Sequence, residues 1–152
     1  MPALTPSKIA DYFIRTANEV GSPITNLKLQ KLVYYAQAWS LALRDRTLFE
    51  DDFEAWVHGP VTRQLWDEYK TLRWQPIVKD VPNITFDQDV ENFLKEVVQV
   101  YFACDAYELE RMTHEEAPWR EARGNLPPDA PCSNVISKDR MASFYKELAQ
   151  QN

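Results

Sequence analysis

Apolar residues recur at helical spacing along most of the chain, and this pattern predicts a mainly α-helical protein. The clearest segment runs from Asn26 to about Arg44, where apolar residues form one stripe and also cover much of the remaining circumference. A helix that is apolar nearly all round is buried on several sides, so we expect residues 26–44 to form the central helix. Asn26 is the expected cap of this helix.

Further helices are predicted over 6–18, from Pro60 to about Trp74, from Thr85 and from Asp105, with a short turn at 119–123 and a last helix after Ser137. Residues 53–57 are expected to form a short strand or an extended segment, and the proline-rich stretch 125–132 a loop. The predicted fold class is therefore all-α. We expect a compact single-domain helical bundle over residues 1–152, with at most a small strand pair.

The formal net charge of −6 lies in the second half of the chain, because residues 1–75 hold equal numbers of acidic and basic side chains. No basic run is present, which argues against direct binding to nucleic acid. The acidic half would attract a basic partner, or it is simply a solvated surface. Two dispersed cysteines and the absence of a leader or membrane-spanning stretch favour the cytoplasm.

Few side chains suggest catalysis or metal binding. The 2 histidines and 2 cysteines are scattered, so we expect no metal and no cofactor. His58 and His114 are interpreted mainly as structural histidines, and a reaction that uses either one as a base remains an alternative. Trp39, Trp56 and Trp119 are expected in the core. For Trp66 and Trp74, core packing and partner contact are equally expected, since tryptophan is enriched at interfaces.

Three motifs occur in order along the chain: KLQKLVYYAQ at 28–37, FEAWVHGPV at 53–61 and THEEAPW at 113–119. Together they resemble the Panacea domain, also called the SocA-like antitoxin domain, whose members include phage-associated proteins. The resemblance extends from about Ser7 to Tyr145. The family's motif positions correspond here to Lys28, Gln30, Lys31, Tyr34, Tyr35, Trp56, His58, Gly59, Pro60, His114, Pro118 and Trp119.

The resemblance implies an antitoxin that is encoded beside a protein toxin and neutralises it by direct contact. The SocA member instead delivers its toxin to the ClpXP protease, so an adaptor that contacts a ClpX-type unfoldase is an alternative. An uncharacterised hydrolase-like enzyme is a third. A DNA-binding appendage is not expected at this length, and the oligomeric state stays open. The motif residues and Trp66 are the candidates for partner contact, although most of the apolar ones are expected to hold the fold.

Overall fold

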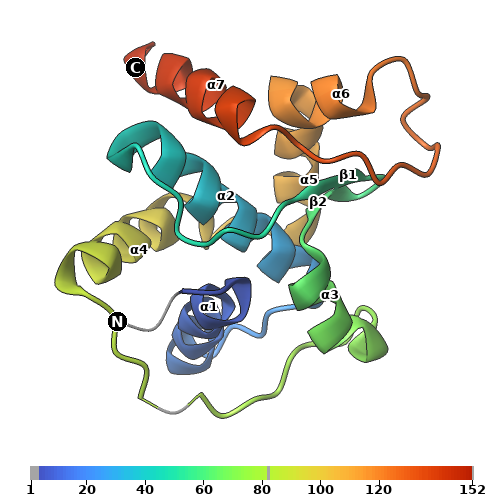
Figure 1. The fold of residues 1–152 in the computed structure, drawn as a ribbon. Helices are drawn as coiled ribbons and strands as arrows, with labels where there is room; N and C mark the ends of the chain where they lie inside the picture. The colour runs from blue at the N-terminus through green and yellow to red at the C-terminus, as the bar shows by residue number, and fades with distance from the viewer. Residues whose placement is uncertain (1–3, 82, 152) are drawn as a thin grey trace.

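The computed structural model describes residues 4–81 and 83–151 (Figure 1). Within these residues the chain forms seven α-helices, one 3-10 helix and a two-stranded hairpin: α1 (Pro6–Val20), α2 (Asn26–Arg44), β1 (Glu54–Trp56), β2 (Gly59–Val61), α3 (Arg63–Tyr69), η1 (Lys70–Leu72), α4 (Gln88–Tyr101), α5 (Ala106–Glu115), α6 (Ala117–Arg123) and α7 (Lys138–Gln150). The mainly helical fold class is confirmed.

Helix α2 lies at the centre of the protein, as its apolar circumference predicts (Figure 1). It packs against α1, α3, α4, α5, α7 and β2. Buried side chains occur on every side of the helix, including Leu29, Leu32 and Tyr35. Near the carboxyl end of α2 the burial is incomplete. Leu43 belongs to the apolar stripe and was expected to be buried, but its side chain is 56% exposed. None of the helices in the described part of the chain is long and apolar enough to cross a membrane.

Capping side chains fix most helix starts where the sequence places them. The side chains of Thr5, Asp105 and Ser137 each accept a hydrogen bond from the backbone N–H three residues later, which confirms three predicted caps. The prediction for α2 was wrong by one residue. Thr25 is the cap, because its hydroxyl accepts from Lys28 N and frees Asn26 to bond Gln30 inside the helix.

The predicted start of the fourth helix at Thr85 was also wrong. Helix α4 begins at Gln88 after Asp87, whose side chain makes no cap hydrogen bond. The capping-box spacing of Thr85 and Gln88 is therefore present in the sequence but not used. The helix is instead held by packing of its apolar face, since Val90, Leu94 and Val97 are buried.

Pro60 was expected to open a helix and instead lies in strand β2, opposite Ala55 of β1. The turn is possible because Gly59 adopts a φ of 108°, which reverses the chain directly after Trp56–His58. Proline lacks a backbone N–H, and it is tolerated in this short edge strand because β2 pairs on one side only and does not need a donor at Pro60. Helix α3 starts only at Arg63. The helical stretch after the hairpin, predicted to reach about Trp74, ends with the 3-10 helix at Leu72.

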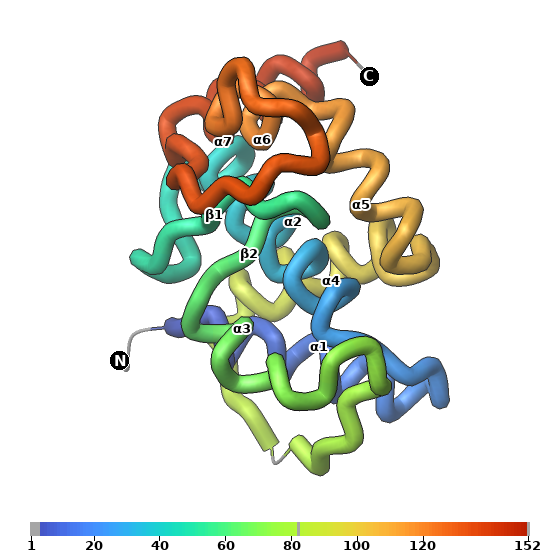
Figure 2. The backbone as a smooth tube through the Cα atoms, turned by 90° about the vertical axis from the view of Figure 1, so that its right-hand side faces the viewer, coloured from blue at the N-terminus to red at the C-terminus, as the bar shows by residue number. Residues whose placement is uncertain are grey.

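Figure 2 looks onto the hairpin, with the segment that joins α6 to α7 above it and α3 below it. The joining segment contains the predicted loop 125–132 and then runs beside β1, where Ala55 N donates to Asn134 O and Ile136 N donates to Phe53 O. The hairpin is thereby enclosed between two segments that are far apart in the sequence. This arrangement creates the surface described next.

Candidate functional site

Burial divides the candidate residues into two groups around the first half of α2. Side chains of the first group are packed inside: Lys31, Tyr34, Tyr35, Pro60 and Trp119. The second group is partly or fully exposed: Lys28, Trp56, His58, Trp66 and His114. The first group therefore holds the fold, and the partner role of the second group stays a prediction.

Lys31 is fully buried where α2 meets the hairpin turn and α5. Among the described residues, no hydrogen-bond acceptor contacts its Nζ. Burial lowers the pKa of Lys31 to about 7, and the nearby Glu110 carboxylate opposes this shift. An unpaired buried ammonium is costly, so the pKa falls toward neutrality. Lys31 is therefore a strained core residue that does not reach the surface.

Both histidines lie near Glu110. His58 is at the exposed hairpin turn, with Nδ1 3.1 Å from Glu110 Oε1. His114 stacks on Trp119 at a centroid distance of 4.0 Å, and burial lowers the pKa of its imidazole. Trp119 in turn donates from Nε1 to Trp56 O at 2.8 Å. The predicted structural use of His114 and Trp119 fits these contacts, since both link α5–α6 to the hairpin.

A buried network of hydroxyls joins α2 to α6 and α7 through Glu116. Tyr35 and Tyr145 both donate to Glu116 Oε1, at 2.7 and 2.8 Å, and Tyr34 shares a hydrogen bond with Tyr145. Burial raises the pKa of Glu116, while the two tyrosine hydrogen bonds oppose the shift. Sequence reasoning missed Glu116 as a structural residue, although it stands inside the THEEAPW motif.

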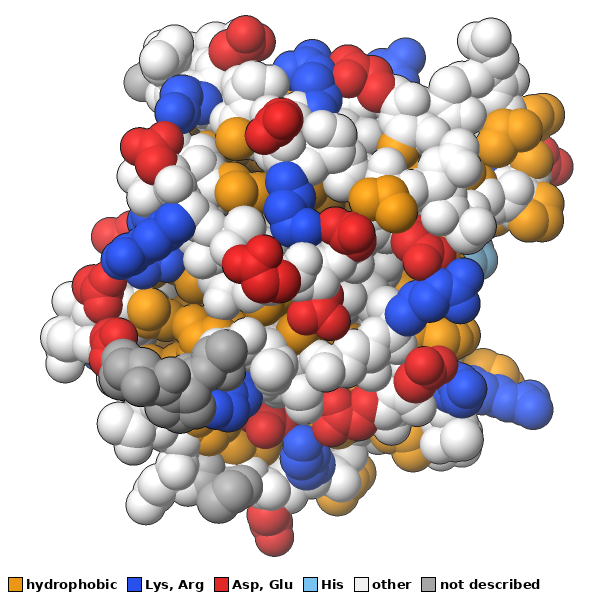
Figure 3. All heavy atoms as spheres, viewed as in Figure 1, with side chains coloured by type: hydrophobic (Ala, Val, Ile, Leu, Met, Phe, Trp, Pro, Cys, Tyr) orange, Lys and Arg blue, Asp and Glu red, His pale blue; other side chains and the backbone are white. Residues whose placement is uncertain are grey.

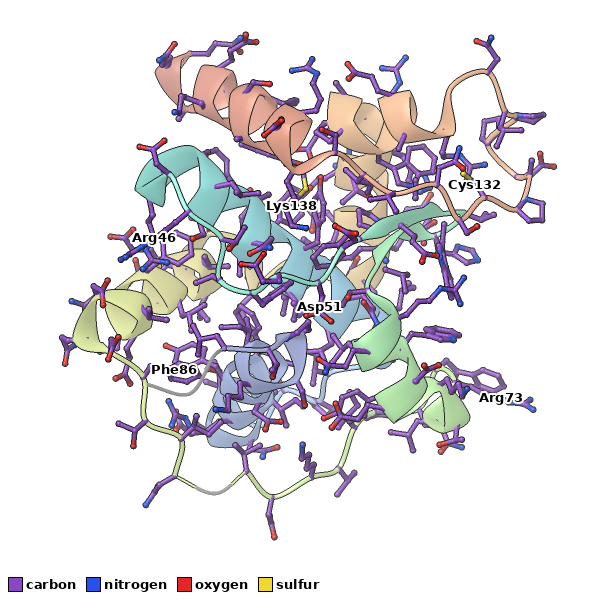
Figure 4. The ribbon with its side chains drawn as sticks, viewed as in Figure 1. Arg46, Asp51, Arg73, Phe86, Cys132 and Lys138 are labelled. Atoms are coloured by element: carbon purple, nitrogen blue, oxygen red, sulfur yellow. The ribbon has the colours of Figure 1, made fainter. Side chains whose placement is uncertain are left out.

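An open groove of about 850 Å³ lies beside the hairpin, between α3–η1 and the loop 131–133. Arg73 and Cys132 are two of its lining residues, and Figure 4 shows them on the same side of the molecule. The apolar part of the lining contains Leu27, Trp56, Val57, Val61, Trp66, Trp74, Pro131 and Cys132. Trp56 and Trp66 meet edge to face at 5.2 Å, and Trp74 is 76% exposed. Trp56, expected in the core, is thus only half-buried.

Basic side chains surround this apolar groove. Arg63, Lys70, Arg73 and His58 line it, and none of its described lining residues is acidic. Arg63 is held by Glu54 at 2.8 Å and Lys70 by Asp67 at 3.3 Å. Elsewhere, on the face in Figure 3, acidic and basic side chains are interspersed. Neither the arginines nor the loop 131–133 was identified from sequence, because only the fold brings the hairpin, α3–η1 and this loop together around one groove.

The arrangement fits recognition of another molecule by contact. Within residues 4–81 and 83–151, no three His, Cys, Asp or Glu side chains come together as a metal site would require. The groove instead combines large aromatic surfaces with fixed positive charges. Such a combination is typical of binding surfaces, whose energetic centres are rich in Trp, Tyr and Arg.

Comparison with known proteins identifies a family and a relative of this chain. The chain is 28% identical over 124 residues to Antitoxin SocA of Caulobacter vibrioides (strain NA1000 / CB15N), an alignment that covers 73% of this chain. The chain spans 66% of the length of that relative. No solved structure matches this chain. The family model "Antitoxin SocA-like, Panacea domain" matches residues 29–120, more than half of the chain and all three motifs except Lys28. The chain therefore belongs to the SocA-like Panacea domain family.

Proposed function

We propose that this chain is the antitoxin of a toxin–antitoxin pair and that it neutralises its toxin by direct protein–protein contact. One observation carries the proposal: Trp56, Trp66 and Trp74, which all lie in the segment that matches the antitoxin family, line an open groove. Desolvating three tryptophans against a partner is a strong source of binding free energy. The toxin is encoded by the gene adjacent to that of the antitoxin.

The whole of residues 1–152 acts as one domain in the cytoplasm. Helices α1 and α7 lie largely or wholly outside the matched segment, and both pack against α2. The core of the family segment therefore depends on them. Cys104 and Cys132 are both free thiols, which suits a reducing compartment.

Binding is favoured over catalysis because one titratable motif side chain is buried and another is partly covered by a neighbouring ring. Lys31 is fully buried, and His114 is stacked on Trp119. A catalytic acid or base must reach a substrate proton. The exposed pair of His58 and Glu110 is the remaining candidate for such a role. A binder keeps its function when Glu110→Gln is introduced, because Glu110 does not line the groove, whereas an enzyme that uses the pair of His58 and Glu110 does not.

The test is co-expression with the protein encoded by the adjacent reading frame. We expect the antitoxin to restore growth of cells that express this toxin and to co-purify with it. Failure of both would contradict the proposal. The same assay in cells that lack ClpX separates the mechanisms, because neutralisation by direct contact persists there and delivery to a protease does not.

A further inference from the structure

The groove beside the hairpin is assembled from four parts of the chain, and the start of α2 contributes Asn26 and Leu27. The hairpin supplies Trp56, α3–η1 and the residues after it supply Trp66 and Trp74, and the loop after α6 supplies Pro131. Its volume of about 850 Å³ is large enough for several side chains of a partner. An apolar lining of this kind requires large apolar side chains from whatever fills it.

The charge around the groove is opposite to that of the chain. The chain carries a net charge of −6, yet the charged side chains of the groove lining are Arg63, Lys70 and Arg73. Among the described residues, no carboxylate pairs with Arg73. A basic segment would be repelled here, whereas carboxylates would be attracted to the groove.

A buried donor points to the same kind of ligand. Asn26 lines the groove and is 2% exposed, and no acceptor among the described residues contacts its Nδ2. Its Oδ1 already accepts from Gln30 Nε2 at 3.3 Å. A buried donor without a partner is unfavourable, so an occupant that presents an oxygen to Nδ2 is stabilised.

These features favour a protein segment over a nucleic acid strand. Two of the three cations are already paired, Arg63 with Glu54 and Lys70 with Asp67. Tracking a phosphate backbone needs a continuous set of available cations. One available arginine beside a deep apolar surface instead suits a few carboxylates next to apolar anchors.

We infer that the groove binds a segment of the toxin that carries one or two large apolar residues flanked by Asp or Glu. The apolar side chains enter between Trp56, Trp66 and Trp74, and a carboxylate pairs with Arg73. This inference rests on the proposed function and names the chemistry of the toxin segment. The acidic side chains of the second half of the chain are then not the ones that contact this segment, since none of them lines the groove.

The experiment measures the affinity of the purified antitoxin for the purified adjacent-gene toxin, using two matched pairs of variants. Trp74→Ala is compared with Tyr107→Ala, because these aromatic side chains are 76% and 77% exposed and only Trp74 lines the groove. Arg73→Glu is compared with Arg120→Glu, since both arginines are exposed and only Arg73 lines the groove. Unfolding curves establish that all four variants fold.

We expect Trp74→Ala and Arg73→Glu each to weaken toxin binding by about tenfold or more, while the two controls bind like the wild type. The wild-type affinity should fall as salt is raised, and Arg73→Glu should reduce that dependence. Groove variants that bind as tightly as their controls would overturn the inference and leave the proposed function intact. A wild type that neither binds nor neutralises the toxin would reject both.

Two other occupants give distinct results. If the wild type sediments as a dimer and Trp74→Ala as a monomer, the groove holds a second copy of this chain. If a fluorescent single-stranded oligonucleotide binds the wild type but not Trp74→Ala, the groove holds nucleic acid. Either result overturns the inference.

Discussion

A β-carbon added to Gly59 would lie 2.5 Å from Cε of Lys31 and 3.0 Å from Oγ1 of Thr113. The hairpin turn thus rests directly on the buried lysine of the central helix. The GP of the FEAWVHGPV motif and the second lysine of the KLQKLVYYAQ motif are parts of one contact. The presence of both motifs in the same sequence is explained by packing between the hairpin and α2.

Gly59→Ala is expected to destabilise the protein by about 2–4 kcal/mol, because the new methyl group overlaps Lys31 and the φ of 108° is strained for any L side chain. The free energy of unfolding is measured by urea denaturation. The matched control is Gly124→Ala, which also has a positive φ but meets no atom within 4 Å. We expect that control to cost about 1 kcal/mol. Equal losses at both positions would show that the contact with Lys31 has no energetic role.

Lys31→Met is expected to stabilise the protein by about 1–3 kcal/mol near pH 6, because it removes an unpaired buried ammonium and keeps the apolar stem. Burial lowers the pKa of Lys31 from 10.5 to about 7. Between these values the unfolded chain binds the proton and the folded chain does not. The contribution of Lys31 to stability therefore falls as pH is lowered from 10.5 to about 7.

The advantage of Lys31→Met should accordingly shrink as pH is raised, by up to about 1.4 kcal/mol per pH unit within this window. Urea denaturation at several pH values between about 6 and 9 measures it. Parallel pH profiles for wild type and variant would show that Lys31 keeps its proton in the folded protein. Lys95→Met serves as the control, since it removes an exposed lysine on the surface of α4.

Glu116→Gln is expected to retain the fold, because an amide oxygen can still accept from Tyr35 and Tyr145. Glu116→Leu should lose about 2–4 kcal/mol, since both buried hydroxyls would lack an acceptor. Burial raises the pKa of Glu116 above its ordinary 4.5, so the folded chain binds the proton more tightly than the unfolded chain. The stabilising contribution of the protonated carboxyl is lost as pH rises through the raised pKa.

Glu116→Gln should therefore be most favourable, relative to wild type, at neutral pH and should lose this advantage below about pH 4. Thermal unfolding at the two pH values provides the comparison. If Glu116→Leu is as stable as Glu116→Gln, the hydroxyl network does not hold α2, α6 and α7 together.

Arg123→Met is expected to release the loop that closes one side of the groove. The guanidinium is 4% exposed and donates to the carbonyls of Ala55, Pro127 and Ala130 at 2.9, 2.8 and 2.6 Å. Removing it takes away the side-chain donor to the carbonyl oxygens of Ala55 and Ala130, while Pro127 O keeps its bond from Ala130 N, and the expected loss is about 3 kcal/mol or more. Hydrogen exchange should increase across residues 125–135, whereas α1 should be unaffected. Unchanged protection of the loop would contradict this assignment.

The central helix could be predicted from the sequence because most of its consecutive residues are apolar, and a helix that is apolar on most sides is buried. Apolar side chains surround most of 26–44, so most of this helix must be buried, although Leu43 near its end is exposed. The cap residues Thr5, Asp105 and Ser137 act over only three positions. Thr85 and Pro60 show the limit of such local rules. Capping spacing at Thr85 and a proline opening at Pro60 are both permitted locally, but packing of α4 and pairing of the hairpin decided otherwise.

The sequence by itself determined the helical class, the buried centre and the family motifs, since each depends on neighbouring residues or on periodic spacing. The groove was decided by tertiary structure alone. Trp56, Arg73 and Pro131 come from three separate segments. Their proximity depends on the turn at Gly59 and on the hydrogen bonds that Arg123 donates to backbone carbonyls of β1 and of the loop after α6. No local sequence pattern predicts that these three residues lie close together, because their proximity results from the packing of distant segments against one helix.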